Sequence, residues 1–131
     1  MKRALLFSIV VLLVAPNALG QNAKQRREAT YQSTLHAYSE DLKPGMTRKE
    51  VEDYLHAKST PYVTMCCVDE RSAMADLVRI GKEKHPWYCS EHVVYIAFQF
   101  VDEPFDGHHS SHRDSDKLKA VTIHHSLEGC L

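Results

Sequence analysis

The chain has 131 residues with a formal net charge of −1 at pH 7, and 25% of its residues are charged. This length suits one domain with a modest hydrophobic core. The nearly balanced charge and the lack of a basic run exclude the positively charged surface that nucleic-acid binding requires, so we expect no nucleic acid among its partners.

The first 20 residues have the layout of a secretory signal peptide. Lys2 and Arg3 precede a mostly apolar run over residues 4–15. This run is shorter than the roughly 20 apolar residues that a membrane-spanning helix needs. Ala18 and Gly20 supply small residues at the positions that a signal peptidase reads, so we expect cleavage after Gly20.

Residues 21–131 are therefore expected to form a single exported domain, in the periplasm or outside the cell, with no transmembrane span after cleavage. An uncleaved membrane anchor is the alternative, which the length of the apolar run disfavours. No cysteine precedes Cys66, so the sequence predicts no lipid anchor at the mature N-terminus.

A helix is predicted from residue 22 to about residue 42. This segment lacks glycine and proline and repeats apolar residues at helical spacing. These residues are Tyr31, Leu35, Tyr38 and Leu42. Pro44 and Gly45 are expected to end the helix and turn the chain.

A second helix is predicted directly after this turn. Thr47 and Glu50 have the spacing of a capping box, in which each residue satisfies a backbone amide of the other. Val51 and Leu55 form its apolar stripe, and Pro61 follows its end. We expect the two helices to form one layer that packs against a sheet.

Strands are predicted over residues 62–67, 92–101 and 117 to about 126, because these segments are rich in β-branched and aromatic residues. Residues 72–80 are ambiguous and suggest a short strand only over 77–80. The expected fold is α+β: two N-terminal helices packed on one face of a three- to four-stranded antiparallel sheet.

Side chains of the strand at 92–101 alternate between the two faces of this sheet. The more apolar face, which should meet the helices, consists of Val94, Ile96, Phe98 and Phe100. The opposite face, which is expected to be available to a partner, consists of Val93, Tyr95, Ala97 and Val101 with Leu118 and Ala120.

The four cysteines are Cys66, Cys67, Cys89 and Cys130. An even number in a small exported domain favours disulfides over metal ligands or reactive thiols. Pairing the neighbours Cys66 and Cys67 strains the peptide between them, so we expect each to reach a distant partner, Cys89 or Cys130. A vicinal Cys66–Cys67 bond that acts as a redox switch is the alternative.

Nine histidines stand out in the composition, and they are densest just before the last predicted strand. His108 and His112 lie four apart, which places both imidazoles on one side of a helical turn. With His109 and with Asp106 or Asp114 they have the ligand types of a weak zinc or copper site. The segment offers no ligand pair on a regular element, so a solvated loop is the simpler interpretation.

No catalytic constellation is recognisable. The chain has no G-x-S-x-G serine motif, no C-x-x-C pair and no glycine-rich phosphate loop. Oxidised cysteines are not nucleophiles. We therefore predict no catalytic residue, no enzymatic activity and no cofactor apart from the possible weak zinc or copper ion.

Trp87, the only tryptophan, stands beside Tyr88 and ahead of Cys89. Aromatic residues at such positions anchor protein interfaces, and they also cover disulfides and close cores. Packing of Trp87 over a disulfide is the favoured interpretation, with a role in an interface as the alternative. The candidate interface residues are Trp87, Tyr88, Val93 and Tyr95.

Residues 42–55 read LKPGMTRKEVEDYL. This segment resembles the helix–turn–helix signature of the SmpA/OmlA family, the BamE-like outer-membrane assembly lipoproteins. Two helices followed by an antiparallel meander are also similar to the secreted β-lactamase-inhibitor-protein fold. The resemblance implies a small envelope domain that binds other proteins without catalysis. This chain lacks the lipidated cysteine of the lipoproteins.

These observations lead to an expected function as an exported, non-enzymatic protein-binding module of the cell envelope, either a scaffold or an inhibitor. Its partner would be an envelope or secreted protein. The alternative is a periplasmic metal-binding protein that uses His108, His109 and His112. A third hypothesis is thiol–disulfide chemistry at Cys66 and Cys67.

Overall fold

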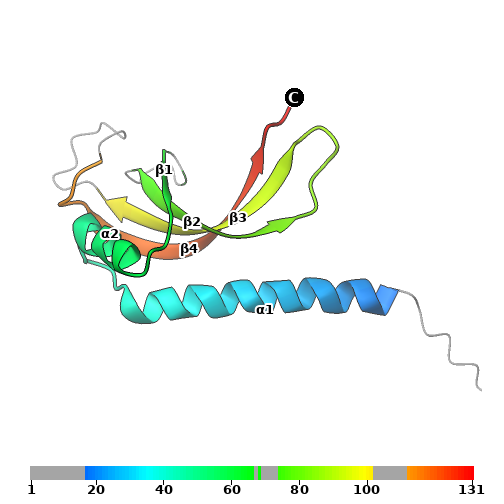
Figure 1. Ribbon diagram of the computed structural model, residues 1–131, viewed down its shortest axis with the longest axis horizontal. Coiled ribbons are helices and arrows are strands. Elements are labelled where there is room, and N and C mark those ends of the chain that lie inside the picture. Colours follow the sequence, from blue (N-terminus) through cyan, green and yellow to red (C-terminus); the bar gives the residue numbers. More distant parts are fainter. Residues whose placement is uncertain (1–16, 67, 69–73, 102–111) are drawn as a thin grey trace, which may run out of the picture.

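The computed structural model describes residues 17–66, 68, 74–101 and 112–131. In chain order its elements are α1 (Asn17–Asp41), α2 (Arg48–Ala57), β1 (Val63–Met65), β2 (Ala75–Glu83), β3 (Glu91–Val101) and β4 (Lys117–Glu128). The strands form one antiparallel sheet in the order β1-β2-β3-β4 (Figure 1). The expected α+β class, with both helices N-terminal to the sheet, is confirmed.

Helix α1 begins at Asn17, five residues before the predicted start, and it runs along one face of the curved sheet (Figure 1). Residues 21–30 are all exposed, whereas Tyr31 is buried against the sheet. Of the described part of α1, cleavage after Gly20 would remove the first turn and keep Tyr31 and the rest of the helix. Most of the predicted signal peptide, residues 1–16, lies outside the described residues.

Neither helix in the described part of the chain combines the length and apolar composition that crossing a lipid bilayer requires.

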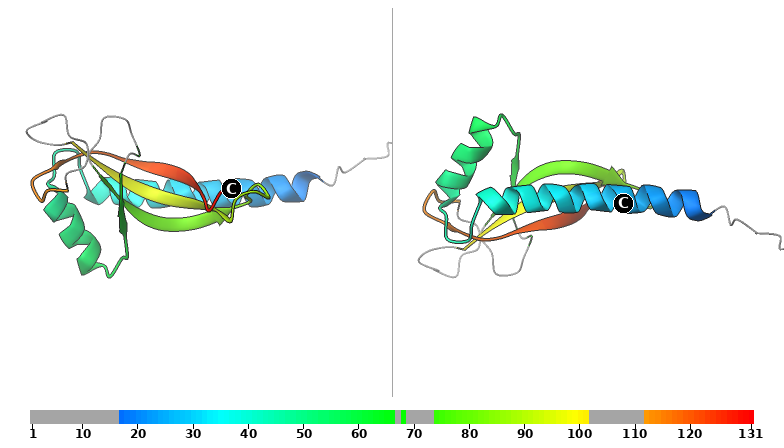
Figure 2. Two further views of the ribbon diagram at one scale, coloured as in Figure 1. Left: turned by 90° about the horizontal axis from the view of Figure 1, so that it is seen from above. Right: turned by 90° about the horizontal axis from the view of Figure 1, so that it is seen from below.

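Helix α2 begins at the predicted capping box. The backbone amide of Thr47 donates to Oε2 of Glu50 (2.7 Å), and the amide of Glu50 donates to Oγ1 of Thr47 (3.2 Å). Gly45, in the turn before it, has φ +93°, a conformation that favours glycine. This turn sets α2 across the end of the sheet where β3 ends and β4 begins (Figure 2).

Strand β2 is longer than predicted and passes close beneath α1. The register between β2 and β3 shifts between Arg79 and Gly81. A Cβ atom at Gly81 would lie 2.5 Å from Oη of Tyr31. Because Gly81 has no side chain, α1 can approach the sheet closely at this point. The hydroxyl of Tyr31 donates a hydrogen bond to Glu83 (3.2 Å).

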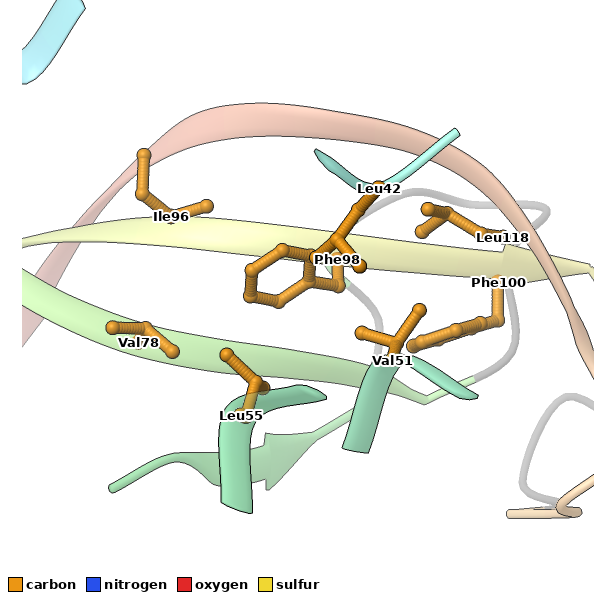
Figure 3. Close-up of a cluster of buried hydrophobic side chains, with 8 residues drawn as sticks. All are labelled: Leu42, Val51, Leu55, Val78, Ile96, Phe98, Phe100 and Leu118. Carbon is orange, nitrogen blue, oxygen red and sulfur yellow. The ribbon is translucent and has the colours of Figure 1, made fainter. Parts of the chain in front are cut away.

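The main core lies between the two helices and the sheet (Figure 3). It consists of Leu42, Val51, Leu55, Val78, Ile96, Phe98, Phe100 and Leu118. The predicted stripes of both helices and the predicted core face of β3 contribute to it. Burial of these apolar side chains supplies the main driving force for folding, at about 25 cal/mol per Å² removed from water.

Leu118 was expected on the opposite face, and this prediction is wrong. Ala120 pairs with Gln99, but Leu118 pairs with Phe100, because the register between β3 and β4 shifts between Gln99 and Phe100. One residue is thereby added on β4, which moves Leu118 to the helix side of the sheet.

The opposite face carries a second, smaller apolar cluster. It consists of Ala75, Leu77, Val93, Tyr95 and Ala97, with Met65 and Val68 packed against it. Neither helix covers this face (Figure 2).

The disulfide pairing differs from the expectation for Cys66 and Cys67. Cys89 is bonded to Cys130, so neither Cys89 nor Cys130 can pair with Cys66 or Cys67. The reason is the register of β3 and β4: Glu91 pairs with Glu128, so the residues just beyond these strand ends meet. Cys66 is not a free thiol. Cys67 lies outside the described residues, so the vicinal alternative stays a prediction.

Candidate functional site

A buried ionic cluster lies beside α2 at the end of the sheet. Arg48, Asp76 and Asp116 are all fully buried. Nη1 of Arg48 lies 3.1 Å from Oδ1 of Asp76, and Nε of Arg48 lies 3.3 Å from Oδ2 of Asp116. Nη2 of Arg48 also donates to the carbonyl of Met74, and its guanidinium stacks 4.0 Å from the ring centre of Phe100.

Arg48 joins three segments of the chain through these contacts. It extends from the first turn of α2, Asp76 belongs to β2, and Asp116 precedes β4. Backbone bonds reinforce this junction, because the amide of Arg48 donates to the carbonyl of Asp116 (2.7 Å). A buried ion pair gains little net stability, but removing one partner leaves an uncompensated charge.

Glu52 and His112 extend this cluster toward the surface. Nε2 of His112 lies 2.7 Å from Oε1 of Glu52, and their side chains are 40% and 16% exposed. Ligand atoms of Glu52, Asp76 and His112 all lie within 4.8 Å of one another. A helix, a strand and the segment before β4 thus place two carboxylates and an imidazole together.

Burial raises the pKa of Asp76 to about 6, although the positive charge of Arg48 and a hydrogen bond from Thr64 act in the opposite direction. Burial also raises the pKa of the nearby Tyr62 hydroxyl, with the negative charge of Glu52 as the next cause. Both shifts indicate a desolvated environment, to which the negative charge of Glu52 adds in each case.

The predicted metal ligands are only partly placed. His112 lies next to Glu52 and Asp76, two acidic residues that the sequence analysis did not select. His108 and His109 lie outside the described residues.

An exposed aromatic pair lies at the opposite end of the sheet. Trp87 is 89% exposed and Tyr88 is 44% exposed. Their ring centres are 5.9 Å apart and their planes are nearly perpendicular, at 87°. Trp87 therefore does not pack over the disulfide as the favoured interpretation expected. We call Trp87 and Tyr88 the aromatic tip.

The aromatic tip is attached to a constrained piece of backbone. Cys89 follows it and is disulfide-bonded to Cys130. The amide of Leu131 donates to the carbonyl of Tyr88 (2.9 Å), and the amide of Cys89 donates to the carbonyl of Pro86 (3.0 Å). These bonds fix the backbone that presents the two aromatic side chains.

The other candidate interface residues, Val93 and Tyr95, are buried. Lys82 pairs with Val93 and Arg79 with Tyr95, so these two cations share the face of the apolar pair. Both cations contact Glu91 (2.7 and 3.2 Å).

A shallow depression of about 280 Å³ lies on the same face. It is lined by Pro61, Tyr62, Val63, Leu77, Arg79 and Tyr95. The hydroxyl of Tyr95 donates to Glu128 (2.6 Å), and burial raises its pKa to about 12.

Sequence reasoning missed Arg48, Asp76 and Asp116, although the spacing of apolar neighbours identifies them. Arg48 lies three and seven residues before the buried Val51 and Leu55, so it shares their helix face. Asp76 in β2 and Asp116, which directly precedes β4, each come two positions before a core residue, and this spacing places them on the core side of the sheet.

No protein-family model matches the chain, and no curated protein or solved structure is similar to it beyond chance.

Proposed function

We propose that the protein is an exported, non-enzymatic binding module that docks on a partner protein of the cell envelope or the extracellular space through its aromatic tip. The partner would present an apolar pocket that receives the indole ring of Trp87. The observation that carries this proposal is the exposure of Trp87, the only tryptophan of the chain.

An exposed tryptophan is thermodynamically unfavourable, because removing its large apolar surface from water lowers the free energy. Trp87 contributes almost nothing to the core of this fold. Tryptophan and tyrosine are enriched among the few interface residues that carry most of the binding free energy. An exposed tryptophan beside a tyrosine therefore favours a binding role over a structural one.

Constraint of the backbone supports the same proposal. Binding costs conformational entropy when a flexible loop must be ordered. Here the Cys89–Cys130 bond and the Leu131–Tyr88 hydrogen bond already order the aromatic tip. Binding through this tip therefore loses less conformational entropy than binding through a flexible loop would.

The aromatic tip is a better docking surface than the helix-free face of the sheet. Val93 and Tyr95, the apolar candidates on that face, are buried. Arg79 and Lys82, which pair with Tyr95 and Val93 on this face, are themselves held by Glu91. Trp87 needs no rearrangement to be contacted.

The predicted signal peptide and the disulfide support a location outside the cytoplasm, where disulfides persist. The resemblance of residues 42–55 to BamE-like proteins points to binding of other proteins in the envelope. The location and the role in the envelope are expectations from the sequence. The choice of Trp87 and Tyr88 as docking residues comes from their exposure in the structure.

Site-specific photo-cross-linking in the producing cell tests this proposal. A photoreactive amino acid is introduced at Trp87 or at Tyr88 and, as a matched control, at the exposed His36 on α1. We expect one discrete protein adduct from positions 87 and 88 and none from position 36. Mass spectrometry of the adduct identifies the partner.

Two results would contradict the proposal. Equal adducts from all three positions would indicate non-specific contacts. Adducts with lipid only, together with flotation of the purified protein on phospholipid vesicles, would make the tip a membrane-contacting device, since tryptophan and tyrosine also favour the membrane–water interface.

A further inference from the structure

Three potential ligands converge beside α2, at the end of the sheet opposite the aromatic tip. One carboxylate oxygen each of Glu52 and Asp76 and a ring nitrogen of His112 lie within 4.8 Å of one another. Ligand atoms of a tetrahedral zinc site are about 3.3 Å apart, since each bond measures about 2.0 Å. Small side-chain rotations would bring the three ligands to this spacing.

We propose that Glu52, Asp76 and His112 form a binding site for one divalent transition-metal ion. The site differs from the loop site expected from the sequence, because two of its three ligands are carboxylates on regular elements. Glu52 lies on α2 and Asp76 on β2, and His112 alone belongs to the segment before β4.

An unpaired oxygen of Asp76 is an independent indication of a ligand. Its Oδ1 accepts a hydrogen bond from Thr64 (2.9 Å) and one from Arg48 (3.1 Å). Its Oδ2 is buried and has no hydrogen-bond partner within the described residues. A buried carboxylate oxygen without a partner costs free energy, and a bound cation would remove that cost.

The balance of charge favours a cation as well. Arg48 contacts the carboxylates of Asp76 and Asp116, and the carboxylate of Glu52 lies close to that of Asp76. Arg48 divides its positive charge between Asp76 and Asp116. Within the group of Glu52, Asp76, Asp116 and Arg48, the negative charges outnumber the positive one, and a cation beside Asp76 and Glu52 would reduce this excess.

The ligand types select the class of ion. Calcium and magnesium prefer oxygen ligands alone, whereas an imidazole with carboxylates suits first-row transition metals such as zinc. Three protein ligands leave a fourth tetrahedral position for water. Thr64 would orient Asp76 through its hydrogen bond to Oδ1, as residues behind a metal ligand commonly do.

Calorimetric titration of the purified, tag-free protein with zinc chloride tests the proposal. The informative variants are Glu52→Gln and His112→Gln, because both side chains are partly exposed and neither contacts Arg48 in the buried pair. The chain supplies a matched control on α1, where Nε2 of His36 lies 3.2 Å from Oε1 of Glu40. The control variants are His36→Gln and Glu40→Gln.

We expect one zinc ion per chain in the wild type. Either informative variant should weaken binding at least about tenfold, because even the residues behind a metal ligand contribute 10- to 100-fold to affinity. Both control variants should bind zinc as the wild type does. Circular dichroism spectra of all four variants should match that of the wild type.

No zinc binding by the wild type would overturn the proposal. Binding that persists in Glu52→Gln and His112→Gln but disappears when His108 and His109 are both replaced by Gln would also overturn it. That result would assign the ion to the loop histidines instead.

Discussion

Arg48 connects α2, β2 and the segment before β4 through charges that have no access to water. Its guanidinium contacts Asp76 and Asp116, and all three side chains are fully buried. The neighbouring residue, Lys49, contacts Asp53 on the surface of the same helix (2.9 Å). The two adjacent cations therefore allow a direct comparison of a buried and an exposed ion pair.

Replacing Arg48 by Met should destabilise the fold by about 3–5 kcal/mol, because two buried carboxylates lose their partner. Urea unfolding, followed by circular dichroism, measures this loss. The control variant Lys49→Met should leave the free energy of unfolding almost unchanged, since exposed ion pairs contribute little. Similar losses in both variants would show that Arg48 is not buried as described.

His124 should make stability depend on pH. Burial lowers its pKa below the ordinary value, and the neighbouring His125 lowers it further. The folded state therefore disfavours the charged imidazole, so stability is fully present above about pH 6.5 and falls as the pH drops below that value.

The variant His124→Gln should consequently lose less stability than the wild type between pH 7.5 and pH 5.5. Contributions from groups that do not interact with His124, including Asp76, are common to both proteins and cancel in the comparison. Urea midpoints at the two pH values provide the measurement. Parallel shifts in the two proteins would contradict the assignment to His124.

At the scale of single elements, the two helices differ in what positions them. Helix α1 depends on its contact with the sheet, where Tyr31 lies over Gly81. Helix α2 is short, and its start is defined by hydrogen bonds between Thr47 and Glu50. Because Arg48 follows the cap directly, the cap also positions the buried ionic cluster.

Loss of the cap should therefore be measurable. Thr47→Ala is expected to cost roughly 1 kcal/mol, the usual effect of removing a side-chain cap. Thr47→Ser keeps the hydroxyl and should retain most of the stability. Thermal unfolding of both variants checks this, and an equal loss in Thr47→Ser would assign the effect to the methyl group of Thr47.

The sequence predicted the elements whose signals are local. The helical spacing of Tyr31, Leu35 and Leu42 and the capping residues identified both helices. Alternation identified β3. Strand β2 was underestimated, since the prediction covered only residues 77–80, whereas the strand continues through Gly81 to Glu83.

Features that depend on contacts between distant segments could not be predicted in the same way. The pairing of Cys89 with Cys130 follows from the register of β3 and β4, and the position of Leu118 follows from a register shift. Neither register is encoded by local periodicity. The candidate metal ligands Glu52 and Asp76 lie in different elements, so only the fold brings them to His112.

At the scale of the whole molecule, the sheet separates two features at its opposite ends. The buried ionic cluster and the proposed metal site lie where β2 begins and β3 ends. The aromatic tip lies where β2 ends and β3 begins. The Cys89–Cys130 disulfide joins the two ends of the chain segment that contains β3 and β4.

Removing this bond should loosen the whole molecule. The double variant Cys89→Ser, Cys130→Ser is expected to lose about 2–4 kcal/mol, because the unfolded chain regains the entropy of a loop spanning 41 residues. Urea unfolding of the oxidised wild type and the variant gives the difference. An unchanged urea midpoint would contradict a stabilising role.

The claim on which the proposed function depends is that Trp87 binds a partner and does not stabilise the fold. Its most direct test is the affinity of the purified Trp87→Ala variant for the partner that cross-linking identifies, measured together with its thermal midpoint. We predict an affinity at least about tenfold weaker and an unchanged midpoint, since Trp87 is 89% exposed. An unchanged affinity would contradict the proposed docking at the tip, and a lowered midpoint would make Trp87 a structural residue.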